Sequence, residues 1–308
     1  MNRLTRSLQL ANTWLMDDAA PVMRAIEAEA APFRLMRPAE APTPVICASP
    51  HSGRIYPAAM MAASRLDRHA IRRSEDAHVD ELVAAAPDCG HALIAAEYAR
   101  AFIDVNREPW ELDPGMFADD LPAFAKARTA RVAAGLGAIA RIVCEGQEIY
   151  ARKLTFTEAE SRVRTVHQPY HAALAALIAE TQGRHGRVIL IDWHSMPAAA
   201  ARDRMGDVCD MVLGDRFGSA CAAQVSSHIE RRLTAMGYRL CRNAPYAGGY
   251  TTEHYGRPGR GVHAVQIEIN RALYFDETRL CLTEGVGRLK ADLGRLFADL
   301  AATDWAAL

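Results

Sequence analysis

The chain alternates short apolar runs with longer stretches in which apolar residues recur every three or four positions. The short runs are typical of buried strands, and they lie at residues 45–49, 91–96, 101–105, 187–192, 210–214, 238–242 and 263–269. The longer stretches have the spacing of amphipathic helices, at roughly 69–86, 122–150, 157–182, 217–236 and 277–301. This alternation predicts an α/β protein, with a sheet covered by helices.

The pattern also predicts how the chain is divided. Residues 37–44, RPAEAPTP, indicate an entry loop that follows an N-terminal arm. No glycine, serine or proline-rich linker divides the remainder, and no repeat is visible. The chain has 308 residues, half of them hydrophobic, which is enough for a large core. We therefore expect an arm over residues 1–40, packed on a single domain over residues 41–308.

Composition narrows the partners and the compartment. Lys and Arg number 36 and Asp and Glu 37, so no overall charge favours nucleic acid or an anionic membrane, and we expect a small-molecule partner. The seven cysteines contain no C-x-x-C pair, which favours reduced thiols and a cytoplasmic protein. Asp17 and Asp18 interrupt the apolar N-terminus, and no uncharged apolar stretch is long enough for a membrane span. The sequence leaves monomer and homodimer open.

Several predicted strands end in chemically unusual residues. His51 and His194 each follow an apolar run at a strand-to-loop transition, and Glu268 lies within another buried run. Ligands in α/β sheets gather at the carboxyl ends of strands. Two histidines and one carboxylate form an open three-ligand zinc site, and a further carboxylate that is not a ligand takes a proton from water. Glu268 has the chemistry of that general base. Either histidine taken singly is also explained by local hydrogen bonding.

The third metal ligand is not fixed by this reasoning. Glu75, Asp76, Asp80 and Glu81 all flank the start of a predicted helix. Each is equally explained as an N-cap or as a first-turn charge that interacts with the helix dipole. The carboxylate is therefore expected from this segment, with its identity open.

Other candidates are weaker. His167 and His171 are one helical turn apart, but the glutamate of an H-E-x-x-H motif is absent, which favours a structural role at a helix start. Ser52 and Ser195 do not lie in a G-x-S-x-G elbow. The glycine-rich segment 246–261 lacks the Lys-Ser/Thr ending of a phosphate cradle, and it indicates a flexible substrate loop.

Seven motifs together resemble the N-formylglutamate amidohydrolase family. They are SPHSG, ARAFIDVNRE, YARKLT with HQPYHAAL, IDWHS, LGDRFGSAC, NAPYAGGYTTEHYG and VQIEINRALY, in order across about residues 44–290. The family is distantly similar to zinc carboxypeptidases and aspartoacylases. This resemblance implies a three-layer α/β/α sandwich around a mixed, mostly parallel sheet of the phosphorylase/hydrolase-like kind.

The resemblance also implies roles for particular residues. It places His51 and His194 as zinc ligands and Glu268 as the catalytic glutamate, although another divalent metal would also suit the site. Arg54 stands where the carboxypeptidases have a ligand glutamate, so Asp76 is the expected replacement, with Glu75 in reserve.

The implied substrate is N-formyl-L-glutamate, which is cleaved to L-glutamate and formate late in histidine breakdown. By the same resemblance Asn106 and Arg107 hold a substrate carboxylate. Arg100 and Arg271 are further candidates because guanidinium groups bind carboxylates bidentately, although surface pairing with nearby acids explains each equally well. Tyr250 is a candidate polar contact.

Two alternatives remain open at this point. One is a non-catalytic metal or carboxylate-binding protein on the same fold. The other is a hydrolase of a different N-acyl amino acid, because a pocket discriminates a single methylene only weakly.

Overall fold

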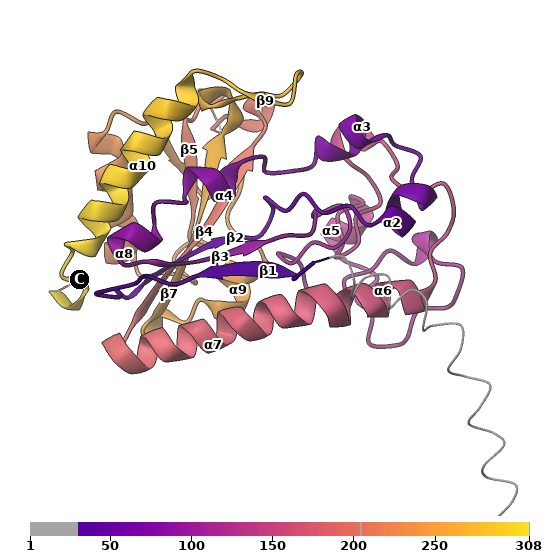
Figure 1. The fold of residues 1–308 in the computed structure, drawn as a ribbon, viewed down its shortest axis with the longest axis horizontal. Helices are drawn as coiled ribbons and strands as arrows, with labels where there is room; N and C mark the ends of the chain where they lie inside the picture. Colours follow the sequence, from indigo (N-terminus) through magenta and orange to yellow (C-terminus); the bar gives the residue numbers. More distant parts are fainter. Residues whose placement is uncertain (1–29, 204, 308) are drawn as a thin grey trace, which may run out of the picture.

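A computed structural model of the protein describes residues 30–203 and 205–307 (Figure 1). Within these residues a seven-stranded sheet has the order β1-β3-β2-β4-β7-β5-β6, and β8 and β9 form a separate pair. The strands are β1 Phe33–Met36, β2 Val45–Ser49, β3 Ala92–Ala96, β4 Val188–Met196, β5 Met211–Gly214, β6 Leu240–Arg242, β7 Val262–Asn270, β8 Phe275–Asp276 and β9 Cys281–Leu282. Strands β3, β2, β4 and β7 are parallel neighbours, whereas β1 and β5 pair antiparallel with β3 and β7.

Helices cover both faces of this sheet, which confirms the predicted three-layer α/β/α architecture. Helices α4, α8 and α10 lie on one side, and α7 runs along the other (Figure 1). The helices are α2 Ala58–Ala63, α3 Arg68–Arg72, α4 Val79–Leu82, α5 Ala130–Ala133, α6 Phe156–Arg162, α7 Gln168–His185, α8 Ala223–Ala235, α9 Tyr250–Tyr255 and α10 Gly285–Ala301, with a π-helical turn, η4 Val163–His167, between α6 and α7. No helix in residues 30–203 and 205–307 has the length and apolar character needed to cross a membrane.

The longest helix shows why the sequence folds as it does. Tyr170, Leu174 and Leu177 of α7 are spaced by four and three residues, so they share one face and are buried against the sheet. The helix stops at Gly186, whose φ of 70° is a left-handed conformation that favours glycine. The predicted helix over 157–182 is thus confirmed.

Three predicted elements differ in the structure. Residues 101–105 are buried but form turns instead of a strand. The run is apolar because it lies in the core, and its backbone amides bond locally, as Ile103 N does to Ala99 O at 3.3 Å. The predicted helix over 122–150 contains only α5 and short turns, since Gly135 and Gly146 both adopt φ of 76°. Residues 69–86 form two short helices, α3 and α4, separated by the loop that carries Asp76.

Two of the cysteines form a disulfide. The prediction of reduced thiols is wrong for Cys209 and Cys241, which form a disulfide with a Cα–Cα distance of 6.0 Å because β5 and β6 are neighbours.

The predicted arm over residues 1–40 lies outside the described residues as far as residue 29. Its described part includes β1, which pairs with β3. The division into an arm and a single domain stays a prediction.

Candidate active site

The two central strands carry the site on one of their faces. In β4 and β7, Asp192 is opposite Gln266 and His194 is opposite Glu268. Because side chains alternate across a sheet, these four point to the same side. Earlier on that same side both strands are apolar, so the face changes from core to polar site along the strands, toward their carboxyl ends.

His51 reaches the site from a tight turn after β2. Gly53 shapes this turn, since a Cβ there would lie only 2.2 Å from the backbone oxygen of Tyr98. Glycine is therefore required for the close approach of the two segments. The turn leaves the His51 side chain 3% exposed, and its ring lies against that of His194, with ring centroids 4.6 Å apart.

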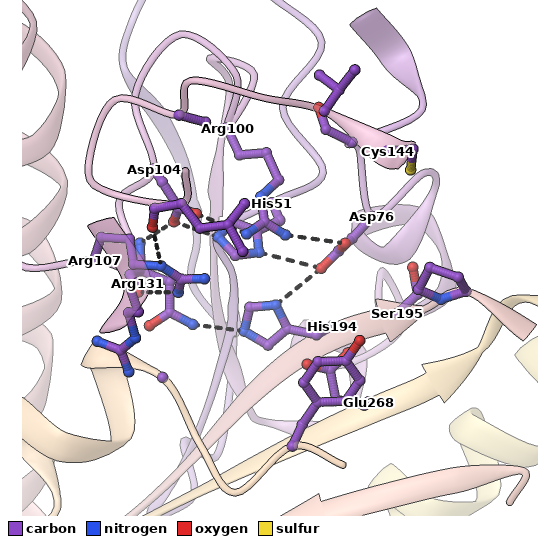
Figure 2. A pocket seen from close by; sticks show the side chains of 18 of the residues that line it. His51, Asp76, Arg100, Asp104, Arg107, Arg131, Cys144, His194, Ser195 and Glu268 are labelled. Carbon is purple, nitrogen blue, oxygen red and sulfur yellow. Dashed lines mark hydrogen bonds and ion pairs between the residues drawn. The ribbon is translucent and has the colours of Figure 1, made fainter. Parts of the chain in front are cut away.

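Asp76 joins the two histidines from the loop between α3 and α4. Its backbone N donates to His51 O at 3.1 Å, which fixes the loop against the β2 turn. Its Oδ2 lies 2.9 Å from His194 Nδ1 and 3.3 Å from His51 Nδ1. The donor atoms of all three residues lie within 4.8 Å of one another, and all three side chains are buried (Figure 2).

The other acids of this segment face elsewhere. Glu75 accepts a hydrogen bond from Tyr56 Oη at 2.8 Å, and Asp80 pairs with Arg34 and Arg54, each at 2.7 Å. Asp80 and Glu81 lie in the first turn of α4, as their alternative interpretation predicted. Among these acids only Asp76 faces the histidines.

Outer carboxylates orient both imidazole rings. His51 Nε2 lies 2.6 Å from Asp104 Oδ1, and His194 Nε2 lies 3.0 Å from Asp192 Oδ2. Both rings therefore present Nδ1 toward Asp76, and the buried Nδ1 of His51 makes no hydrogen bond. Two imidazoles with carboxylate partners and one further carboxylate are the donor set and outer shell that protein zinc sites use, so these residues fit a divalent metal.

The charges of this group depend on one another. Burial raises the pKa of Asp76, but the hydrogen bond from His194 and the closeness of His51 outweigh it and hold the pKa well below its usual range. Burial lowers the pKa of His194, whereas Asp192 and Asp76 raise it well above its ordinary value. Asp76 is thus held ionised, as a carboxylate ligand to a metal must be.

Replacing Asp104 tests the outer shell. Asp104→Asn keeps the shape of the side chain but weakens its hold on His51, so we expect zinc affinity to fall about 10- to 100-fold. A competition titration against a chromogenic chelator measures this, with the exposed Asp88→Asn as the matched control. An affinity within threefold of the parent would contradict a metal-orienting role for Asp104.

Glu268 lies beside this group without joining it. Its Oε1 accepts a hydrogen bond from Gln266 Nε2 at 2.7 Å. Burial raises the pKa of Glu268 to about 7, with His194 opposing and Asp76 reinforcing the shift. A carboxylate of that pKa both accepts and returns a proton near neutral pH.

The predicted substrate-binding residues are placed differently from one another. Arg100 and Arg271 contact Asp76 Oδ1 at 3.7 and 3.2 Å, so their charges are partly offset. Arg107 Nε and Nη1 donate to the backbone oxygens of Leu136 and Asn106. Among the described residues no carboxylate forms an ion pair with Arg107, and its guanidinium lines the cavity.

Asn106 lines the cavity but its amide is held by other residues, whereas Tyr250 does not line the cavity. Asn106 Nδ2 donates to Asp192 Oδ2 at 2.9 Å, and its Oδ1 accepts from Thr251 N. Tyr250 stacks on His254 at 4.9 Å and is not among the residues that line the cavity. Substrate contact by either stays a prediction.

A cavity of about 540 Å³ joins these groups, and some of its residues were missed by sequence reasoning. Tyr246 lies on its wall, near enough to Glu268 and Asp76 for both to raise the pKa of its phenol, after burial as the larger cause. The nearby glycines were the available signal, because a Cβ at Gly214 of β5 would lie only 2.7 Å from the backbone carbon of Ala247 and 2.9 Å from Gly248 N. Asp104 and Asp192 were signalled only by lying two residues before Asn106 and His194.

His167 and His171 support the site through hydrogen bonds to the backbone of the segment that carries Asn106 and Arg107. Their Nε2 atoms lie 2.9 and 2.7 Å from the backbone oxygens of Arg107 and Val105. Burial lowers the pKa of His171 to about 3, so the ring is neutral. Both histidines therefore brace the segment that carries Asn106 and Arg107.

Comparison with known proteins identifies the family. A sequence model of the N-formylglutamate amidohydrolase family matches residues 43–275. This chain belongs to that family. A crystal structure of an N-formylglutamate amidohydrolase from Ralstonia eutropha JMP134 superposes with a TM-score of 0.85 at 35% identity, covering 91% of this chain and all of the other.

Two relatives of this chain with known names support the family assignment. An N-formylglutamate deformylase of Pseudomonas aeruginosa is 29% identical over 239 residues, covering 76% of this chain and 83% of the relative. One from Pseudomonas putida is 30% identical over 207 residues, covering 66% of this chain and 71% of the relative. A protein of Agrobacterium tumefaciens, 16% identical with a TM-score of 0.57 over 89% of this chain and 96% of its own, shares the fold. The chain is thus an amidohydrolase by family.

Proposed function

We propose that this chain is a zinc-dependent N-formylglutamate deformylase. The observation that carries the proposal is the buried group of His51, Asp76 and His194, which faces Glu268 across a cavity whose wall presents Arg107. The names of the relatives supply the substrate. The cavity volume of about 540 Å³ is ample for a small N-acyl amino acid.

His51, Asp76 and His194 would hold the metal. When bound there, zinc supplies Lewis acidity that polarises an amide carbonyl and makes water more acidic. All three side chains are nearly buried where they line the cavity. Asp104 and Asp192 keep both imidazole Nδ1 atoms directed at the group, so the donors need little reorganisation.

Glu268 moves the proton. Its carboxylate accepts a proton from the water that attacks the formyl carbon, and it then donates that proton to the nitrogen of the leaving glutamate. The carbon–nitrogen bond breaks, and formate and L-glutamate are released. The pKa of about 7 suits both directions of transfer. Gln266, which donates to Oε1, keeps the carboxylate in place.

Arg107 orients the substrate. Its guanidinium is paired with backbone oxygens and with no acid of the described residues, so its charge is available for a carboxylate. Charge-assisted hydrogen bonds of this kind fix orientation as well as affinity. We infer that Arg107 binds the α-carboxylate, and that the reaction serves histidine breakdown in the cytoplasm.

A substrate screen tests the proposal. Zinc-loaded enzyme is assayed with N-formyl, N-acetyl and N-succinyl derivatives of glutamate and aspartate, and formate or free amino acid is measured. We expect N-formyl-L-glutamate to have the highest kcat/KM. A higher value for an acetyl or succinyl compound would assign a different hydrolase activity, and no turnover of any would favour a binding protein.

A further inference from the structure

The cavity presents a second arginine beside Arg107, and we infer that Arg131 recognises the side-chain carboxylate of the substrate. This inference rests on the proposed function, because it assigns the second acidic group of an N-formyl dicarboxylic amino acid. Arg131 belongs to α5, within residues 122–150, which the sequence predicted as one long helix. Figure 2 shows Arg107 and Arg131 on the side of the histidines away from Asp76.

The two arginines form a cationic wall. Arg131 Nη1 lies 3.7 Å from Glu111 Oε2, which is an ion pair beyond hydrogen-bond distance, and Glu111 Oε2 has no hydrogen-bond partner. Burial lowers the pKa of Arg107 most; the charges of Asp104 and Glu111 raise this pKa, and those of Arg100 and Arg131 lower it. Positive charge is thus concentrated where an anion would relieve it.

The backbone holds this wall in place. Arg107 Nε donates to Leu136 O at 3.1 Å, and Ala138 N donates to Glu111 O at 2.7 Å. At Gly137 a Cβ would lie 2.3 Å from Glu111 O, so the glycine permits this close packing. The segment that carries Arg131 is therefore joined directly to the segment that carries Arg107.

The buried carboxylate of Glu111 positions Arg131. Its side chain is 4% exposed, and its Oε1 accepts a hydrogen bond from Thr129 Oγ1. Thr129 Oγ1 in turn accepts from Val132 N at 3.1 Å and so begins α5. Arg131 itself is 34% exposed at the cavity wall, which leaves its remaining N–H groups open to a ligand.

The remaining charges of the cavity separate the two ends of the substrate. Of the acids that line it, Asp76 and Glu268 lie at the reacting end, whereas the two oxygens of Asp104 are already paired with His51 and Arg100. Arg107 and Arg131 are at the other end, so a substrate with its formyl group near Glu268 directs its two carboxylates toward two cations. A neutral amide in place of the second carboxylate loses one charge-assisted interaction there.

The test compares N-formyl-L-glutamate with N-formyl-L-glutamine, which has nearly the same shape without the second charge. We expect kcat/KM of the parent enzyme to favour glutamate by about 10- to 100-fold, the range of one hydrogen bond to a charged group. In Arg131→Gln this ratio should fall to within about threefold of one, mainly through loss of glutamate turnover. Arg131→Met repeats the test if Arg131→Gln does not fold.

The matched control is Arg128→Gln, which removes an exposed cation three residues away that does not line the cavity. It should leave the ratio at the parent value. An unchanged ratio in Arg131→Gln, or an equal fall in Arg128→Gln, overturns the assignment. So does a parent enzyme that hydrolyses both substrates equally well, although the proposed function then stands. A parent that leaves N-formylglutamate intact overturns both.

Discussion

Glu268→Gln should lower kcat for N-formylglutamate by about 10²- to 10⁴-fold, the usual contribution of a positioned general base. The amide keeps the size of the carboxylate and its place opposite His194, but it cannot take a proton from water. Because Glu268 lies outside the group formed by His51, Asp76 and His194, zinc content should remain at the parent level. KM should change little, since Arg107 is untouched.

Single-turnover kinetics and elemental analysis measure this result together. The control is Glu40→Gln, which removes an exposed carboxylate far along the chain from the strands that carry the site. A Glu268→Gln enzyme that binds zinc normally and works near the parent rate would refute the proposed proton transfer. A variant that loses zinc would instead place Glu268 among the ligands.

Asp76→Asn should abolish stoichiometric zinc binding and with it most activity. The loss of a ligand should exceed the roughly 10- to 100-fold fall in affinity that accompanies loss of an outer partner. In this variant only the two histidines remain as ligands. Arg100 and Arg271 lie next to the position of the lost carboxylate, and their positive charges repel a metal ion. Zinc should therefore no longer stabilise the fold, whereas at 100 times Kd it adds about 2.7 kcal/mol to the parent.

Glu75→Gln is the informative control, because it changes the neighbouring acid. Glu75 bonds to Tyr56 and Arg72 and faces away from the histidines, so this variant should retain zinc even if it is less stable. Zinc content by elemental analysis and melting temperature with and without zinc distinguish the variants. Zinc lost from Glu75→Gln but kept by Asp76→Asn would reverse the ligand assignment.

The sequence was most informative where a single buried strand also determines the position of a site residue. The runs that became β2, β4 and β7 were found within a few residues of their ends, and they placed His51, His194 and Glu268 at one edge. These predictions succeed because continuous apolar runs and strand ends are local properties of the sequence. The grouping of the two histidines needed only the neighbouring parallel strands.

The sequence was less informative where loops meet. Asp76 could not be separated from Glu75 by pattern, because the direction of each side chain depends on the break between α3 and α4. Arg131 was missed because residues 122–150 are mostly irregular, with an apolar content that suggested a helix. The contact of Arg131 with Glu111 links two loops, and such contacts leave no periodic signal.

The alternating faces of β4 and β7 have a practical consequence for engineering. Ile191, Trp193 and Ile267 point away from the site into the core beneath α8 and α10, whereas His194 and Glu268 occupy the opposite face. Thermostabilising substitutions can therefore be selected on the α10 side without altering the geometry of the pocket. The loops around Arg131 and Tyr246 can be diversified separately to change which acyl amino acid is accepted.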